Sequence, residues 1–218
     1  MPLPPGQRAL PGPPPPFGLD KYMKRGARVP ADFRLRIDGD VEQPLELSPD
    51  EVVRDRAELT ADLHCVTTWS AVDLRWSGMP FRRFWDDIIV PRARPRSGVA
   101  YLRITALDGY RATIPLEDAL HETAWLADRL GDKPLGVHGA PLRLIVPQLY
   151  GYKNVKHVCR IEVTVDPLRG SAGRVLAHPR ARVDREERSG VGLQRFWRGF
   201  YRLLLPLFLW RARKLARR

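Results

Sequence analysis

The chain contains two cysteines, Cys65 and Cys159, and this number limits the kinds of site that their thiols can form. Two thiols cannot build a disulfide framework, a multi-cysteine zinc site or an iron–sulfur site. A deprotonated thiol can serve as a single soft ligand to a metal, whereas a lone cysteine is more often a small buried apolar residue. The sequence around each cysteine must therefore distinguish a metal ligand from a buried structural thiol.

Cys65 lies in the first of three stretches that carry distinctive motifs. They read HCVTTWS at 64–70 with WSGMPF at 76–81, ITALDGY at 104–110 with IPL at 114–116, and HGAPLRLIVP at 138–147 with YGYKNVKHV at 150–158. In this order and spacing the chain resembles the molybdopterin-binding domain of the sulfite oxidase family of oxidoreductases. The resemblance runs from about Phe33 to about Val165. One cysteine motif alone would be a weak signal, but the ordered set is specific.

The resemblance implies a molybdenum enzyme in which Cys65 is the catalytic residue and the protein's ligand to the metal. In this family molybdenum cycles by two electrons while it gains or loses an oxo group, and sulfur atoms hold it. The pterin dithiolene supplies the other sulfurs, and a soft thiolate suits the remaining position. The metal itself favours loss of the thiol proton. Cys159 has no ligand role in the family pattern, which favours a buried structural thiol.

The third stretch is implied to hold molybdopterin, whose phosphate requires guanidinium, ammonium and backbone N–H donors. By resemblance the cofactor-binding residues here are His138, Arg143, Asn154, Val155 and Lys156. Gly151 would let the backbone approach a ligand closely. Taken singly, His138 could be a loop histidine, Arg143 an outward strand residue and Lys156 a surface charge. Their joint spacing favours the binding interpretation.

Four further residues have two interpretations each. Asp108 either contacts the pterin, as a residue near this turn does in the family, or only completes an Asp-Gly turn; we include it among the cofactor-binding residues. Trp69 and Trp76 either wall the pocket or belong to the core. Arg75 either attracts an oxyanion substrate or is an ordinary surface arginine.

The chain departs from the eukaryotic sulfite oxidases in ways that bear on its substrate. We find neither their tyrosine-containing Arg-Asp-Tyr-Lys-type segment nor their dimerisation and haem domains, so the resemblance favours the cofactor more strongly than sulfite. We expect transfer of an oxygen atom to or from a small oxyanion or sulfoxide. Because the sequence has no Cys-x-x-Cys-His motif and no set of four cysteines, we expect an external electron carrier, a cytochrome or a quinone-linked protein.

Several short strands must position these residues. Apolar and polar residues alternate over 33–37, a hairpin is predicted from 99–107 and 110–114 around Asp108-Gly109, and two more strands are predicted at 142–146 and 161–165. Mixed with two or three helices, these strands predict an α+β fold with a mixed, mainly β core of the molybdopterin-binding type.

Helix signals occur at three places. Ser48, Pro49 and Glu51 predict a helix start with a capping box. A longer helix is predicted from Pro115, along an apolar stripe that ends before Gly131. The third signal lies in the C-terminal tail, where residues 196–210 combine aromatics, leucines and arginines as an amphipathic helix does.

Composition divides the chain into three regions. Residues 1–19 are rich in proline, which favours disorder or polyproline II, and residues 20–170 are expected to form the oxidoreductase domain. Residues 171–218 form a basic tail, in which residues 180–188 are expected to be an exposed linker. Of the net charge of +12, residues 174–218 supply +10 from 13 Lys and Arg against 3 Asp and Glu. The near-neutral remainder argues against a dedicated nucleic-acid reader.

The tail leaves two interpretations open. Its uncharged run of eight residues, 203–210, is far shorter than the roughly 20 residues that span a bilayer. The segment either lies in a membrane interface, attracted to anionic headgroups, or packs on the core. Without an export signal we expect a cytoplasmic protein, peripheral on the inner face of the membrane if the first interpretation holds. A binding module without metal and a nucleic-acid-binding tail remain the alternative functions.

Overall fold

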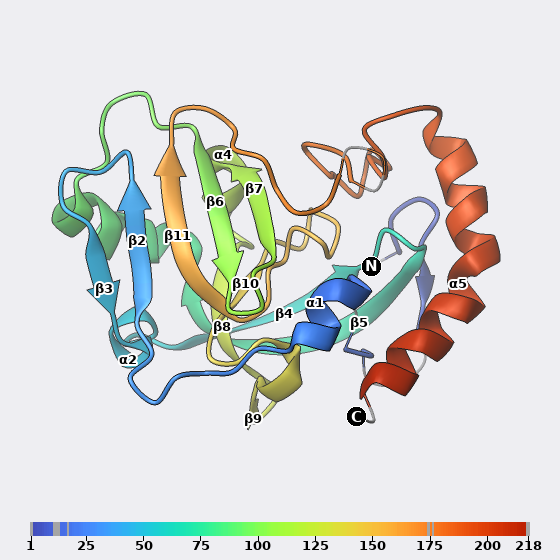
Figure 1. Cartoon of the computed structure of the whole chain (residues 1–218), viewed down its shortest axis with the longest axis horizontal. Helices are drawn as coiled ribbons and strands as arrows, with labels where there is room; N and C mark the ends of the chain where they lie inside the picture. Colours follow the sequence, from blue (N-terminus) through green and yellow to red (C-terminus); the bar gives the residue numbers. More distant parts are fainter. Residues whose placement is uncertain (1, 11–13, 17, 174, 176, 217–218) are drawn as a thin grey trace.

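Two β-sheets form the body of the protein in the computed structural model, which describes residues 2–10, 14–16, 18–173, 175 and 177–216 (Figure 1). The first sheet has the strand order β3-β2-β11-β6-β7. Its strands are β2 (Leu35–Gly39), β3 (Leu45–Leu47), β6 (Tyr101–Ala106), β7 (Arg111–Pro115) and β11 (Val158–Thr164). Strands β2 and β11 run parallel, and the other neighbours in this sheet are antiparallel.

The second sheet contains the longest hairpin of the described chain. Its strands are β1 (Arg8–Ala9), β4 (Ala57–His64), β5 (Trp69–Pro80), β8 (Trp125–Leu130), β9 (Lys133–Pro134) and β10 (Arg143–Ile145). Strands β4 and β5 pair antiparallel, so the four residues between them, 65–68, form the tip of a hairpin. The register pairs His64 with Ser70 beside this tip. Cys65 is therefore the first residue after β4 and lies at the hairpin turn.

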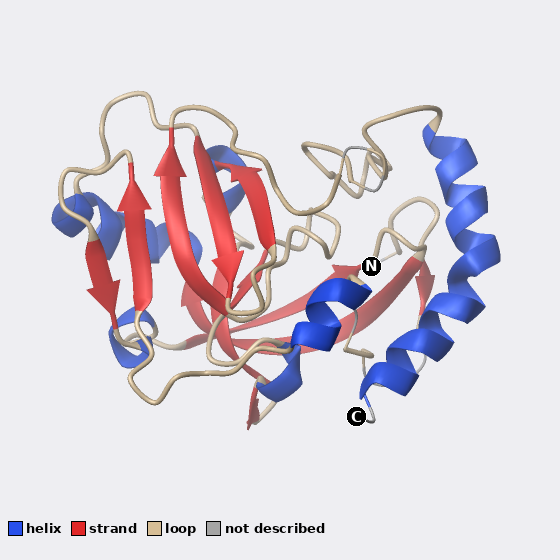
Figure 2. Ribbon diagram, in the orientation of Figure 1, coloured by secondary structure: helices blue, strands red, loops and turns tan. Residues whose placement is uncertain are grey.

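Helices are few and mostly short (Figure 2). They are α1 (Asp20–Arg25), α2 (Pro49–Val52), α3 (Phe81–Phe84), the π-helix η1 (Trp85–Ala93), α4 (Leu116–Ala119), the 3-10 turn η2 (Gly136–His138) and α5 (Gln194–Ala216). The predicted capping box is present at α2, where the Ser48 side chain accepts from the Glu51 N–H and the Glu51 carboxylate accepts from the Ser48 N–H. No helix within the described residues is both long enough and apolar enough to cross a membrane.

The α+β fold class predicted from the sequence is confirmed. Strands β6 and β7 form the predicted hairpin, and β2, β10 and β11 overlap the other three predicted strands. Alternate residues of β2, β6 and β11, including Leu35, Ile37, Leu102, Ile104 and Ile161, are buried in one core cluster. Their side chains remove apolar surface from water, which is the main favourable contribution to such a fold.

The long helix predicted from Pro115 to Gly131 is wrong. Only α4 forms, and residues Trp125–Leu130 are strand β8, paired with β5 on one side and with β10 on the other. Ala124, Leu126 and Ala127 are all buried, so the small and apolar residues that suggested a helix face instead allow a strand to lie between two neighbours. Tertiary pairing overrides helix propensity here.

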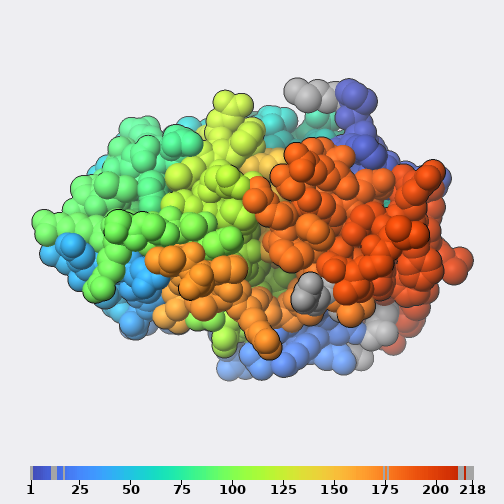
Figure 3. Space-filling view, turned by 90° about the horizontal axis from the view of Figure 1, so that it is seen from above, coloured from blue at the N-terminus to red at the C-terminus, as the bar shows by residue number. Residues whose placement is uncertain are grey.

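Two expectations about the terminal regions need correction. Residues 180–188 are not an exposed linker, because Ala181, Val183 and Arg188 are buried. The disorder expected for residues 1–19 does not extend to β1, which pairs in parallel with the start of β5. Helix α5 packs one face on the core through the buried Tyr201 and through Leu205. Figure 3 shows residues 177–210 gathered at one end of the molecule.

Candidate cofactor site

One cavity of about 1030 Å³ brings together every site residue predicted from the sequence. The seven predicted site residues, all of which line it, are Cys65, Asp108, His138, Arg143, Asn154, Val155 and Lys156. They come from the β4–β5 hairpin tip, the β6–β7 turn and the segments that flank β10, so neither sheet alone could form the cavity. The chain ends complete the wall through Tyr22 and Met23 of α1 and Tyr201 and Phe208 of α5.

Cys65 is held by a tight hairpin turn. Its N–H donates to the Trp69 carbonyl (2.8 Å), and its carbonyl accepts from the Thr68 N–H (3.2 Å). Thr68 has a φ of 72°, in the left-handed region that β-branched residues rarely adopt. The Cys65 Sγ lies 3.0 Å from the Thr67 hydroxyl. The turn thus fixes both the backbone and the thiol of Cys65 before any ligand binds.

Burial raises the pKa of the Cys65 thiol, and this exceeds the opposing effects of the Thr67 hydrogen bond and the Arg188 charge. Without a ligand, Cys65 therefore favours the neutral thiol. A soft metal would displace that proton when it binds, because only the thiolate is a good ligand.

Two residues that the sequence did not single out hold the hairpin from outside. Gln7 donates to the Cys65 carbonyl (3.1 Å) and accepts from the Ser70 hydroxyl (3.1 Å). Arg188, which has no exposed surface, donates to the Val66 carbonyl (2.6 Å) and stacks over the Tyr150 ring at 5.0 Å. The sequence carried no local signal for them, since one lies among prolines and the other in a charged run.

Arg143 is the strongest candidate for anion binding. It is buried, its guanidinium lies over the Trp76 ring at 5.2 Å, and one Nη donates to the His138 carbonyl (2.8 Å). Burial lowers the pKa of Arg143 to about 10. Within the part of the chain that the structure describes, no carboxylate pairs with this guanidinium, which donates to a backbone carbonyl, and no acceptor reaches its Nε. A buried cation with an unmatched donor is costly unless an anion completes it.

Lys156 and His138 add to the same positive region. Burial and the neighbouring Arg143 lower the pKa of Lys156 to about 8, with Asp108 acting in the opposite direction. Burial, Arg143 and Lys156 together lower the pKa of His138. His157 also lines the cavity, and its Nδ1 lies 2.6 Å from the Ala140 carbonyl. These side chains disfavour one another's charge, which a bound phosphate would reverse.

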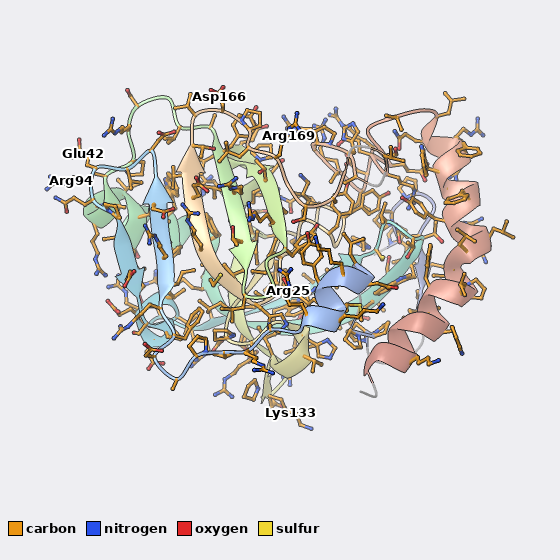
Figure 4. All side chains as sticks on the ribbon, in the orientation of Figure 1. Arg25, Glu42, Arg94, Lys133, Asp166 and Arg169 are labelled. Carbon is orange, nitrogen blue, oxygen red and sulfur yellow. The ribbon has the colours of Figure 1, made fainter. Side chains whose placement is uncertain are left out.

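Asp108 both shapes the turn between β6 and β7 and lines the cavity, so neither of its two interpretations excludes the other. Its carboxylate accepts from the Tyr110 N–H (2.9 Å), so it does shape the β6–β7 turn, while the residue also lines the cavity. Arg25 of α1 donates to the Asp108 carbonyl (3.0 Å) and lies beside this turn in Figure 4. The turn therefore also anchors α1 over the cavity.

Asn154 and Val155 reach the cavity, but their polar groups are used within the chain. The Asn154 side chain accepts from the Val146 N–H (2.6 Å) and donates to the carbonyl of Leu149 (3.1 Å). The Val155 carbonyl accepts from the Leu144 N–H (2.9 Å). These bonds fold the segment after β10 so that Arg143 and Lys156 face one space. The direct cofactor contacts implied for these two residues remain a prediction.

Of the other candidate residues, one lines the cavity and three do not. Trp69 lines the cavity, whereas Trp76 is fully buried beneath Arg143. Arg75 is exposed, and it pairs with Asp132 at 2.9 Å. Cys159 is partly buried, with its Sγ 3.4 Å from the Thr105 carbonyl, and it is not part of the cavity wall.

The donor set fits molybdopterin. Cys65 presents a single soft sulfur at the cavity wall, as a sulfur-held metal requires. Arg143 with its unmatched Nε, Lys156 and His138 present the cationic and N–H donors that a phosphate requires. Gly151 also lines the cavity, and its N–H donates to the His64 carbonyl (2.7 Å) beside Cys65.

The chain is similar in sequence to bacterial oxidoreductases. YuiH of Bacillus subtilis, named an uncharacterized oxidoreductase, is 36% identical over 134 residues, which cover 61% of this chain and 65% of YuiH. The protein-methionine-sulfoxide reductase catalytic subunit MsrP of Xanthomonas axonopodis pv. citri is 32% identical over 166 residues, covering 66% of this chain and 50% of MsrP. The chain thus spans about half to two thirds of the length of these relatives.

Structural comparison supports the same fold. The sulfane dehydrogenase SoxCD of Paracoccus pantotrophus aligns with a TM-score of 0.56 and 20% identity, over 76% of this chain and 45% of that chain. Residues 23–172 match the family described as "Oxidoreductase molybdopterin binding domain". The protein belongs to this family of molybdopterin-binding oxidoreductases, and molybdopterin is its cofactor.

Proposed function

We propose that the protein reduces an organic sulfoxide at a molybdenum centre held by Cys65. The observation that carries this proposal is the apolar surrounding of the thiol. Cys65 clusters with Trp69 and Ala71, and Leu205 of α5 packs against them. Such a wall suits the organic groups on a sulfoxide, whereas a small oxyanion would need accessible cations.

The cations of the cavity have other roles in this proposal. Arg143, Lys156 and His138 act on one another electrostatically, and we assign them to the phosphate of the cofactor. Arg188, whose charge lowers the pKa of the Cys65 thiol, is fully buried and donates to backbone carbonyls. The similarity to MsrP, named a protein-methionine-sulfoxide reductase, supports the same substrate class.

The reaction consumes two electrons and two protons. The sulfur–oxygen bond of the sulfoxide breaks, the oxygen leaves as water, and a thioether remains. When bound, the cofactor supplies a metal that changes by two electrons and accepts or gives up an oxo group. Cys65 holds that metal, the hairpin turn keeps its sulfur in place, and Trp69 and Tyr201 help to exclude water around it.

In this proposal an external carrier supplies the two electrons that reduce the sulfoxide. We propose a cytochrome or a quinone-linked protein as the donor, as expected from the sequence. The cytoplasmic location expected from the sequence stays a prediction.

Reduction of methionine sulfoxide by dithionite-reduced benzyl viologen, alongside the molybdenum content per chain, tests the proposal. The wild type should carry close to one molybdenum and oxidise the viologen when sulfoxide is added. Cys65→Ser should lose turnover while keeping its circular dichroism spectrum. Cys159→Ser is the matched control, because Cys159 lies outside the cavity, and it should retain turnover.

Each contrary outcome has a defined meaning. Full turnover in Cys65→Ser would refute the metal-ligand role. Activity with nitrate or chlorate but not with sulfoxides would refute the substrate class and favour a small oxyanion. Folded protein purified without molybdenum from a molybdate-supplemented host would favour the non-catalytic binding module.

A further inference from the structure

Helix α5 carries an apolar stripe that the core does not cover. Together with the residue just before the helix, the stripe consists of Leu193, Phe196, Phe200, Leu203, Leu207 and Trp210. Their spacing of three and four residues places them on one side of a helix. All six are exposed, with Leu203 79% exposed and Phe196 64% exposed. We call this surface the α5 stripe.

The opposite side of α5 accounts for its attachment to the core. Tyr201 is buried, Leu205 packs on the cluster around Cys65, and Phe208 lines the cavity. Trp197 donates to the Val191 carbonyl (2.7 Å), and Arg198 pairs with Glu186 (3.2 Å). The attachment of α5 therefore does not need the α5 stripe.

The charge of α5 indicates what covers the stripe. Residues 194–216 contain six Lys and Arg and no Asp or Glu. Arg195 and Arg202 are exposed, and helical spacing places them on the flank of α5 between the stripe and the face that packs on the core. A second copy of the helix would bring like charges together, whereas a paired helix usually carries both signs at its flanks. An anionic lipid surface complements both the cations and the aromatic side chains.

We propose that the α5 stripe binds the surface of membranes that contain anionic lipids. The helix lies in the plane of the interface, with Phe196, Leu203 and Trp210 among the headgroups and with Arg195 and Arg202 paired to lipid phosphates. Leu207 belongs to the stripe and also lines the cofactor cavity. Membrane binding therefore brings the rim of the cavity to the bilayer.

Co-sedimentation of the full chain with vesicles tests this inference independently of activity. One set of vesicles is phosphatidylcholine alone, and the other is an equimolar mixture with phosphatidylglycerol. We expect binding to the mixed vesicles, little binding to the neutral ones, and weaker binding as salt is raised. Leu203→Glu should lower the partition coefficient about tenfold or more. The double variant Arg195→Gln/Arg202→Gln should lower it about 30-fold at low salt.

Val90→Glu is the matched control. Val90 is 46% exposed in η1 (residues 85–93), which lies at the opposite end of the molecule from α5 in Figure 1. This variant should bind as the wild type does. Failure of the wild type to bind mixed vesicles, or unchanged binding by Leu203→Glu, would overturn the inference. A wild-type dimer that Leu203→Glu converts to a monomer in sedimentation velocity would overturn it in favour of self-association.

Discussion

Arg143 shows how one buried side chain can indicate a ligand. Its guanidinium has no carboxylate partner among the described residues and lies over a tryptophan ring, with the charge of Lys156 nearby, which is unfavourable unless an anion pairs with it. The strand β10 fixes it there, since both neighbouring residues, Leu142 and Leu144, are fully buried. The arrangement is therefore suited to a phosphate that enters the cavity and pairs with this charge.

Replacing Arg143 by alanine should lower the retention of the cofactor about tenfold or more, because a charge-assisted pair of hydrogen bonds to phosphate is lost. The measurement is the amount of pterin and molybdenum per chain after purification. Arg75→Ala, which removes an exposed arginine paired with Asp132, is the control and should retain both. Equal occupancy in the two variants would contradict the phosphate role of Arg143.

The residues of the candidate site were largely accessible to sequence reasoning, but their individual contacts were not. The ordered motifs identified seven residues, and all seven line one cavity in the structure. They could not show that the Asn154 amide is consumed by backbone groups of residues 146–150. Gln7 and Arg188 were missed because their partners lie 58 and 122 residues away in the chain, at Cys65 and Val66.

Among the elements, most strands were easier to predict than the segment from Pro115 to Gly131 and the longest hairpin. Alternation identified β2, β6 and β7, since one face of each is buried. Apolar and polar residues also alternate over Ala57–His64, which is strand β4, but no strand was predicted there from the sequence. The segment Trp125–Leu130 was predicted as helix because Ala124 and Ala127 continue the apolar helical stripe from Leu116, although buried alanines fit a central strand equally well. Only the pairing with β5 and β10 distinguishes the two.

Lys153 links elements that are distant in the chain, and it gives a prediction about pH. Its ammonium donates to the Thr113 carbonyl of β7 (2.5 Å) and to the Pro179 carbonyl (2.7 Å). Burial lowers the pKa of Lys153 from 10.5 to about 8. Since the unfolded chain then binds this proton more tightly than the folded one, the stability contributed by Lys153 rises as pH rises from about 8 to 10.5.

Compared with Lys153→Met, the wild type should gain on the order of 3 kcal/mol in free energy of unfolding over that pH interval. Guanidinium denaturation at several pH values measures the difference and cancels the titration of cysteines and tyrosines common to both proteins. Lys133→Met, at the exposed Lys133 labelled in Figure 4, should show no such trend. A difference that stays flat or falls with pH would contradict the prediction.

In the whole molecule, both ends of the chain close over the family domain. The domain matches residues 23–172, yet Gln7 and Arg188 lie outside it and hold the Cys65 hairpin. Arg188 also donates to the Pro5 carbonyl (3.4 Å), so it joins the first and last parts of the chain at one point. The proline-rich start and the basic tail are thus parts of the site's support.

Arg188→Met should lower the free energy of unfolding by about 1–3 kcal/mol, because the carbonyl of the partly buried Val66 loses its donor. In protein without cofactor, the Cys65 thiol should also react faster with a disulfide reagent as the hairpin loosens. The exposed Arg185 supplies the control variant, Arg185→Met. Unchanged stability and thiol reactivity in Arg188→Met would show that the hairpin keeps its shape without this clamp.

The position of α5 in the cavity wall has a consequence for biosynthesis. Tyr201, Leu207 and Phe208 are synthesised after every other residue that lines the cavity, and they complete walls that the earlier residues form. The cavity is therefore more open to solvent while α5 is undocked. We expect the cofactor to enter most readily at that stage of synthesis, before α5 closes this side of its compartment.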